Sequence, residues 1–433
     1  MNYLPMPEPI RPRIRQLELV PLEEGDEPTY ALRDPYGYAG TAALPMAAAM
    51  LVTLMNGKRT LGELQSAFAQ QVGKSIALED VEKVVRQLDE RMFLDSEKFA
   101  AHKTAITTAY DELDVRPAAH AGGAYHGDIQ PLRTQLADLF TCEEGPGLLP
   151  WEGNTNGDFA KTTDKRLCGV MSPHIDLHRG GPAFAWAYDR IVTESDAEVF
   201  VILGTAHTPL QSLFSVSSKH FNTPIGTVET DREFIAALRD RYSQYTNEEE
   251  VLRTFQDEMP HRREHSIEFQ ALMLQFVLGE RRDYKMVPIL VGSFHPFVTQ
   301  NRSPSDSPSV ADFTTCLRQT IDSYDKKVCY IAGVDMAHIG QHFGDEKLLD
   351  EERLKRQWTD DQVLLSAACE GDTEGWFIHV AAVQDKNRIC GLAPTYSMLQ
   401  AMQPTHGEIL RYDQAVSDDR TSCVSFASVA FYE

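Results

Sequence analysis

This sequence has no long apolar run, no excess of basic residues and no paired cysteines. The longest apolar stretch, residues 44–55, is about half the length of a membrane-spanning helix, so no membrane segment is expected. The chain of 433 residues holds 41 Lys and Arg against 64 Asp and Glu, a net charge of −23. This balance argues against nucleic acid or an anionic membrane surface as the partner. The seven cysteines form no C-x-x-C pair, so we expect no disulfide framework and a reducing, cytoplasmic setting.

The N-terminal part of the chain has the pattern of a small separate module. Residues 1–15 contain four prolines and no apolar core of the signal-peptide kind. Thr60 followed by Glu63 predicts a helix N-terminus, because the hydroxyl and the carboxylate can each accept a backbone N–H. The predicted elements are strands at 16–23 and 29–33 around a turn at 25–28, helices at 44–55, from 61 onward and at 78–91, and a return strand at 92–95. This order of elements predicts a winged-helix domain over residues 1–112.

The module resembles the PqqD-like family of winged-helix peptide-recognition domains. The resemblance rests on the run at 54–64, a helix end, a turn and a capped helix start, and it covers roughly residues 14–100. It implies a peptide partner, whereas the commoner use of a winged helix is DNA binding. Residues 11–98 hold 11 basic and 14 acidic side chains, and 11 − 14 = −3 disfavours DNA. A structural appendage without a ligand is the third alternative.

The remaining residues, 113–433, alternate between short apolar runs and amphipathic stretches. Such alternation predicts an α/β domain with a mixed, mainly parallel sheet layered with helices. Residues 142–163 lack periodicity and are expected to form a surface loop. The predicted strands are 168–171, 198–203, 286–291 and 328–332, with a last strand at 424–431 whose alternating polar and apolar residues suggest a sheet edge.

Polar residues follow three of these strands directly. His174 follows the first strand, His207 the second, and Asp335 with His338 the fourth. Because the carboxyl ends of parallel strands meet at one edge of a sheet, these side chains are expected to converge. Two imidazoles and a carboxylate from different loops form the ligand set of a non-haem Fe(II) or Zn site. The alternative for each residue alone is an ordinary hydrogen-bonded loop position.

A further polar cluster begins a predicted helix. Glu264, His265 and Glu268 stand at its N-terminus, where they suit general acid–base work or the orientation of a metal ligand. A capping and salt-bridge cluster explains the same pattern equally well. His261 and His265 have i,i+4 spacing, although His261 follows a proline and so could lie outside the helix.

Several ordered motifs resemble the MEMO family, which includes the AmmeMemoRadiSam system protein B of bacteria. The resemblance covers residues 115–433 and implies a fold similar to that of class III extradiol dioxygenases. It places the family's two metal-binding histidines on His174 and His207. The family's third ligand, a cysteine in eukaryotic members, falls on Ala337, which has no donor atom, so Asp335, His338 or His265 could replace it. The matching runs are His-Ala-Gly at 120–122 with Tyr125, Ser-Pro-His at 172–174, Leu-Gly-Thr-Ala-His at 203–207, Glu-His-Ser-Ile-Glu at 264–268, Val-Pro-Ile-Leu-Val-Gly at 287–292, Asp-Met-Ala-His at 335–338 and Ile-Cys-Gly at 389–391.

The sequence therefore predicts a metal-dependent protein that oxidises or modifies a small molecule or a peptide. His174, His207 and Asp335 are the expected ligands of a divalent transition metal, most simply Fe(II). An oxygen donor in place of the missing thiolate would shift preference from Cu(I) toward Fe(II) or Mn(II). His265 is expected to carry a proton, with Glu264 and His338 adjusting its basicity. The alternative is a binding protein that holds a peptide or a metal in the same cleft without turnover.

Overall fold

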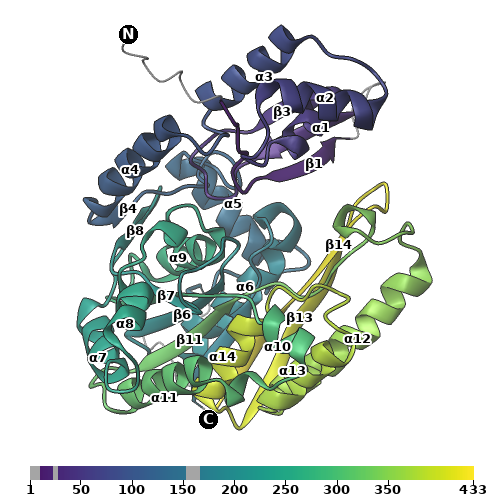
Figure 1. Cartoon of the computed structure of the whole chain (residues 1–433). Coiled ribbons are helices and arrows are strands. Elements are labelled where there is room, and N and C mark those ends of the chain that lie inside the picture. Colours follow the sequence, from purple (N-terminus) through teal and green to yellow (C-terminus); the bar gives the residue numbers. More distant parts are fainter. Residues whose placement is uncertain (1–9, 23–27, 153–165) are drawn as a thin grey trace. The chain divides into compact units, whose positions relative to one another are not determined.

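A computed structural model describes residues 10–22, 28–152 and 166–433 of the chain (Figure 1). Most of the predicted turn at 25–28 and much of the predicted loop at 142–163 lie outside the described residues. The chain separates into two compact units, Met1–Glu112 and Leu113–Glu433. Each unit is built around its own core, so each is described by itself.

In its described residues, the N-terminal unit contains a three-stranded antiparallel sheet in the order β1-β2-β3 and four helices. Most predicted elements are present, but β3 was missed because it shares the apolar run at 44–55 with the following helix. Pro45 ends that strand and precedes the helix. The elements are β1 (Glu18–Leu22), β2 (Thr29–Arg33), β3 (Ala42–Pro45), α1 (Met46–Leu54), α2 (Leu61–Val72), α3 (Leu78–Glu90) and α4 (Glu97–Asp111).

Helix starts in this unit follow the sequence signals. Thr60 and Glu63 form the predicted capping box of α2, which satisfies backbone donors that the helix cannot pair itself. The predicted return strand at 92–95 is reduced to one bridge, between Ile14 and Leu94. The core of the unit is formed mainly by Leu32, Leu51, Leu64, Phe68, Val81, Val85, Leu88 and Phe93.

The large unit is an α/β domain with a mixed sheet. The centre of its eight-stranded sheet is parallel, with β5, β11, β6 and β10 side by side. β7 pairs antiparallel with β10, and β14 pairs antiparallel with β5, β12 and β13. The strands are β5 (Leu167–Ser172), β6 (Val199–Thr205), β7 (Phe214–Val216), β10 (Lys285–Val291), β11 (Val328–Gly333), β12 (His338–Ile339), β13 (His406–Val416) and β14 (Cys423–Tyr432). The predicted α/β class with a mixed sheet is confirmed.

The prediction that the last strand forms an edge is wrong. All ten residues of β14 are buried, and the strand lies inside the sheet. Its alternating polar residues are small serines that find partners in the interior: Ser428 donates to the Ala183 carbonyl, and Ser425 accepts the backbone N–H of Ala337. Buried hydroxyls of this kind imitate the pattern of a solvent-facing strand.

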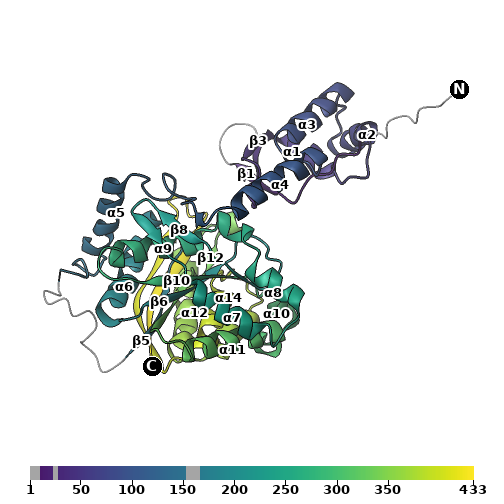
Figure 2. The same ribbon diagram turned by 90° about the vertical axis from the view of Figure 1, so that its left-hand side faces the viewer.

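Helices cover both faces of this sheet (Figure 2). Successive strand residues point to opposite faces, so Val201 joins the core beneath one helical layer and Ile202 the core beneath the other. One layer contains α5 (Ile129–Thr141), α6 (Leu177–Glu194) and α9 (His265–Leu278). The other contains α7 (Arg232–Tyr242), α11 (Pro308–Asp322), α13 (Thr373–Ala382) and α14 (Leu392–Met402). Further elements are β4 (Val115–Arg116), β8 (His220–Thr223) and β9 (Gly226–Val228), which form a small sheet, and α8 (Glu248–Phe255), α10 (His295–Gln300) and α12 (Glu351–Cys369).

Helix α6 begins soon after the loop that carries His174. Asp176 caps the helix by accepting the backbone N–H of Arg179 at 3.2 Å. Pro182 is the sixth residue of this helix, so the His178 carbonyl lacks the backbone N–H that would otherwise pair with it. His178 is consequently helical, while His174 lies in the preceding loop.

The start of α9 approaches the carboxyl ends of two strands closely. A Cβ atom on Gly204 of β6 would stand 2.6 Å from the Ser266 hydroxyl, and one on Gly333 of β11 would stand 2.5 Å from the Ser266 carbonyl. Only glycine leaves room for the helix at this distance. The first turn of α9 therefore lies beside the loops that follow β6 and β11. Among the described residues, no helix is long and apolar enough to cross a membrane.

Candidate metal centre

His174, in the loop after β5, has one ring nitrogen committed to the protein. Its Nδ1 lies 2.9 Å from the Gly333 carbonyl, and because a carbonyl only accepts, Nδ1 carries the proton. Nε2 therefore carries the lone pair of the ring and, among the described residues, has no backbone partner. The residue is buried, so its neutral tautomer faces the interior of the site ready to act as a ligand.

His207, in the loop after β6, is held by Glu264 at two points. Its backbone N–H donates to Glu264 Oε2 and its Nδ1 to Oε1, both at 2.9 Å. Glu264 is the N-cap of α9 and also accepts the backbone N–H of Ser266. Burial opposes ionisation of Glu264, but the His207 imidazole and these hydrogen bonds hold its pKa well below the usual range. The carboxylate fixes His207 with Nε2 directed away from Glu264.

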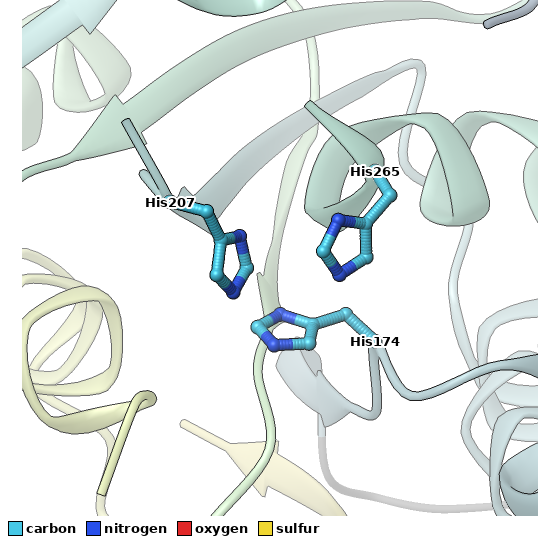
Figure 3. A group of neighbouring side chains, drawn as sticks. All are labelled: His174, His207 and His265. Carbon is cyan, nitrogen blue, oxygen red and sulfur yellow. The ribbon is translucent and has the colours of Figure 1, made fainter. Parts of the chain in front are cut away.

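The ring of His265, the first residue of α9, completes a group of three imidazoles. It stacks on His207, with ring centroids 4.5 Å apart and planes inclined by 22°. The His174 ring lies 5.0 Å from that of His207 and 5.2 Å from that of His265. Figure 3 shows the three rings pointing toward one another, His265 from its helix and the others from loops. One nitrogen of each ring lies within 4.8 Å of the others.

Asp335 and Cys390 also lie beside His174. Asp335 Oδ1 accepts the backbone N–H groups of His174 and Ile175, and Oδ2 lies 3.5 Å from His174 Nε2. Cys390 Sγ lies 3.3 Å from the same nitrogen. His174, Asp335 and Cys390 therefore form a second group of donor atoms within 4.8 Å of one another.

The structure groups the predicted ligands differently from the sequence analysis. We expected His174, His207 and Asp335 together, whereas His207 is grouped with His265, and Asp335 with Cys390, with His174 common to both. The resemblance places the family's cysteine on Ala337, which has no donor atom, whereas the structure brings the thiol of Cys390 close to His174 and Asp335. Cys390 belongs to the Ile-Cys-Gly run at 389–391, but no sequence pattern links this run to the strand ends. Cys390 precedes α14 and comes near His174 only through tertiary structure.

The other predicted residues lie around these donors. His338 Nδ1 faces the carbonyls of Met336 and Arg388 at 3.3 and 3.2 Å, and the residue belongs to neither donor group. His261 lies in the short turn before α9, with Nε2 3.1 Å from the Ser215 hydroxyl. It is thus separate from His265, despite the i,i+4 spacing. Glu268 is buried and forms an ion pair with Arg116.

The charge balance of the site favours neutral imidazoles. Burial and the neighbouring His207 lower the pKa of His174 to about 3. Burial likewise lowers the pKa of His265 to about 3, although Glu264 opposes the shift. Burial opposes protonation of His207, but the charge and hydrogen bond of the Glu264 carboxylate together raise its pKa. Because imidazoles bind metals in their neutral form, two of the three rings are already in that form at neutral pH.

Comparison with known proteins places this chain in a family. Residues 116–430 match the family described as Memo-like protein. A MEMO1 family protein of Aquifex aeolicus is 25% identical over 426 residues, covering 98% of this chain and all of the relative. Its counterpart in Methanopyrus kandleri is 29% identical over 325 residues, covering 73% of this chain and 98% of the relative, and one in Saccharolobus islandicus is 31% identical over 242 residues, covering 56% and 75%. The chain belongs to the Memo-like family, as the resemblance predicted.

Proposed function

We propose that the large unit binds one divalent transition metal through His174 and His207, with the remaining donors drawn from His265, Asp335 and Cys390. The observation that carries this proposal is the surroundings of His174 Nε2, which is free of the backbone and faces imidazole, carboxylate and thiol donors. Nitrogen donors suit Fe, Zn and Cu, and the thiol adds affinity for softer ions. The donor set fits a transition metal better than Mg²⁺ or Ca²⁺, which prefer oxygen ligands.

Two contacts prepare the imidazoles for this role. The Gly333 carbonyl holds the tautomer of His174 and the Glu264 carboxylate that of His207. Such hydrogen bonds from outside the ligand set orient the rings and raise their basicity. Both rings can therefore bind a metal with little rearrangement of the surrounding loops.

The proposed activity is metal-dependent oxidation or modification of a small molecule or a peptide, with Fe(II) as the metal. When bound, such an ion supplies redox and Lewis-acid chemistry. His265, which lies 3.3 Å from Glu264 and is 31% exposed, can either complete the ligand set or exchange a proton with substrate. His338 lies outside both donor groups, and its proposed role is to adjust the basicity of His265. The parallel strands between helical layers support a fold of the class III extradiol dioxygenase type.

Oxygen consumption tests the activity. Protein reloaded anaerobically with Fe(II) is mixed with oxygenated buffer containing catechols or short peptides, and uptake is followed with an electrode. We expect uptake in the wild type and none in His174→Ala. Equal uptake by both proteins contradicts the proposal. Metal binding without uptake favours the alternative, a binding protein that uses the same site.

For the N-terminal unit we propose a PqqD-like winged-helix domain that recognises a peptide. Its antiparallel sheet offers strand edges to which an extended peptide can add by main-chain hydrogen bonds. Helix α3 carries Lys83 and Arg86 against five acidic residues, a poor surface for phosphate. The relative from Aquifex aeolicus aligns along its entire length with nearly the whole of this chain, which supports a joint role for the two units.

A further inference from the structure

Arg116, the last residue of β4, is a fully buried charge beside the candidate metal centre. Its guanidinium donates from Nε to the His261 carbonyl at 2.6 Å and from Nη2 to the Glu264 carbonyl at 2.9 Å. These two carbonyls belong to the turn that leads into α9. One side chain therefore ties down both ends of the segment that presents Glu264 and His265.

The charge of Arg116 is balanced by Glu268, in the first turn of α9. The two side chains form an ion pair of 2.6 Å between Nη1 and Oε2, and both are buried. Glu268 also accepts the backbone N–H of His120 and the hydroxyl of Tyr125. Burial opposes ionisation of Glu268, but the Arg116 charge overcomes it and lowers the pKa of the carboxyl. The pair thus joins the 119–125 loop, β4 and the start of α9.

The position of this charge is unusual on electrostatic grounds. A helix N-terminus carries partial positive charge and disfavours a cation, and a buried ion pair contributes little net stability because of its desolvation cost. Stability alone therefore gives a weak account of a guanidinium at this place. Its fixed fork of donors instead matches the two carbonyls and the carboxylate at once, a geometry that lysine does not reproduce.

We propose that Arg116, together with Glu268, is a positioning residue for the metal centre, holding Glu264 and His265 in register with His174. The inference rests on the proposed metal site. Arg116 touches none of the donor atoms, and it acts through the backbone of the turn before α9. Because Glu264 in turn fixes His207, two of the three imidazoles depend on this contact. His174 and Asp335 have hydrogen bonds of their own, from His174 Nδ1 to the Gly333 carbonyl and from the backbone N–H of His174 to Asp335.

The test compares Co(II) binding by full-length wild type, Arg116→Lys and His174→Ala, measured by competition with a chelator and by visible absorption. Arg116→Lys keeps the positive charge opposite Glu268 but loses the planar set of N–H donors that binds the two carbonyls. We expect it to weaken Co(II) binding by roughly tenfold or more, as is typical for residues that orient metal ligands, and to change the ligand-field bands.

Arg15→Lys is the matched control. Arg15 is a buried arginine paired with Asp34 at 2.7 Å in the N-terminal unit and also donates to the Met92 carbonyl, so its replacement should leave Co(II) binding unchanged.

The outcomes separate this inference from the proposed function. If Arg116→Lys binds Co(II) within about twofold of wild type while His174→Ala loses binding, the positioning role is overturned and the metal site stands. If His174→Ala binds as wild type does, the metal site itself is overturned. Should Arg116→Lys unfold below the assay temperature, Glu268→Gln, which has the same size but no charge, is judged by the same criterion.

Discussion

The imidazole Nδ1 and the backbone N–H of His207 both donate to the carboxylate of Glu264, each at 2.9 Å. This double contact joins the loop after β6 to the N-cap of α9. It determines the tautomer of His207 and with it the nitrogen available to a ligand. A residue that would otherwise be an ordinary helix cap thereby becomes part of the site.

Replacing Glu264 by Gln should weaken metal binding while preserving the fold. The amide oxygen of Gln can still accept a backbone N–H at the start of α9. Its N–H₂ group, however, is a donor, and so it disfavours the present orientation of the His207 ring. We expect a loss of metal affinity of about 10–100-fold, measured by competition with a chelator. Glu229→Gln, an exposed carboxyl of the same domain, is the control, and equal affinity of the two variants would argue against an orienting role for Glu264.

Replacing Cys390 by Ser should change which metal is preferred. The thiol lies 3.3 Å from His174 Nε2, and thiolate ligands favour Cu(I) over harder ions. Cys390→Ser is expected to weaken Cu(I) binding at least about tenfold more than Fe(II) binding. Competitive titrations measure this, with Cys369→Ser, a half-buried thiol outside both donor groups, as control. An identical preference in all three proteins would remove Cys390 from the site.

Stability should depend on pH through Asp361 of α12. This buried carboxyl accepts hydrogen bonds from Tyr412 and Gln357, but burial raises its pKa to about 6. The folded chain therefore holds the Asp361 proton more tightly than the unfolded chain. The contribution of Asp361 to stability is complete below the pKa of the unfolded chain and is lost as the pH rises through the pKa of the folded chain.

Asp361→Asn removes this dependence. Relative to wild type, its free energy of unfolding should rise by about 2–3 kcal/mol between about pH 4 and about pH 7. Urea titrations at several pH values measure the change, and Asp418→Asn, at an exposed position between β13 and β14, should show none. A constant difference between Asp361→Asn and wild type across this range would contradict the assignment.

The N-terminal unit should not bind DNA. Its helix α3 has 2 basic and 5 acidic residues, 2 − 5 = −3, so binding would release few counterions from a duplex. Fluorescence anisotropy with a labelled duplex and the full-length chain should show no binding that weakens with salt. Micromolar affinity with a steep salt dependence would overturn the proposed peptide role in favour of DNA recognition.

Local signals predicted the elements, and topology brought the site together. The apolar runs gave β5, β6, β10 and β11 because buried parallel strands are apolar on both faces. The rule that parallel strands share one carboxyl edge also brought His174, His207 and Asp335 to one region. These inferences need only short-range patterns and a general property of α/β sheets.

Two features escaped sequence reasoning for physical reasons. The serines of β14 looked solvent-facing because hydrogen bonds to Ala183 and Ala337 occur only in the folded core. Cys390 reaches His174 across a separation of 216 residues, and no periodicity encodes that contact. The division of the donor atoms into two groups around His174 likewise depends on the conformations of the side chains. A pattern of residue types does not specify these conformations.

Metal content after reloading tests the central claim most directly. Wild type, His174→Ala, His207→Ala and His295→Ala are incubated anaerobically with Fe(II), freed of loosely held ions and measured by elemental analysis. His295 is exposed on α10 and serves as the control. We expect about one ion per chain in the wild type and the control, and far less in His174→Ala and His207→Ala, because a site that loses an imidazole binds weakly. Equal metal content in all four proteins would contradict the account.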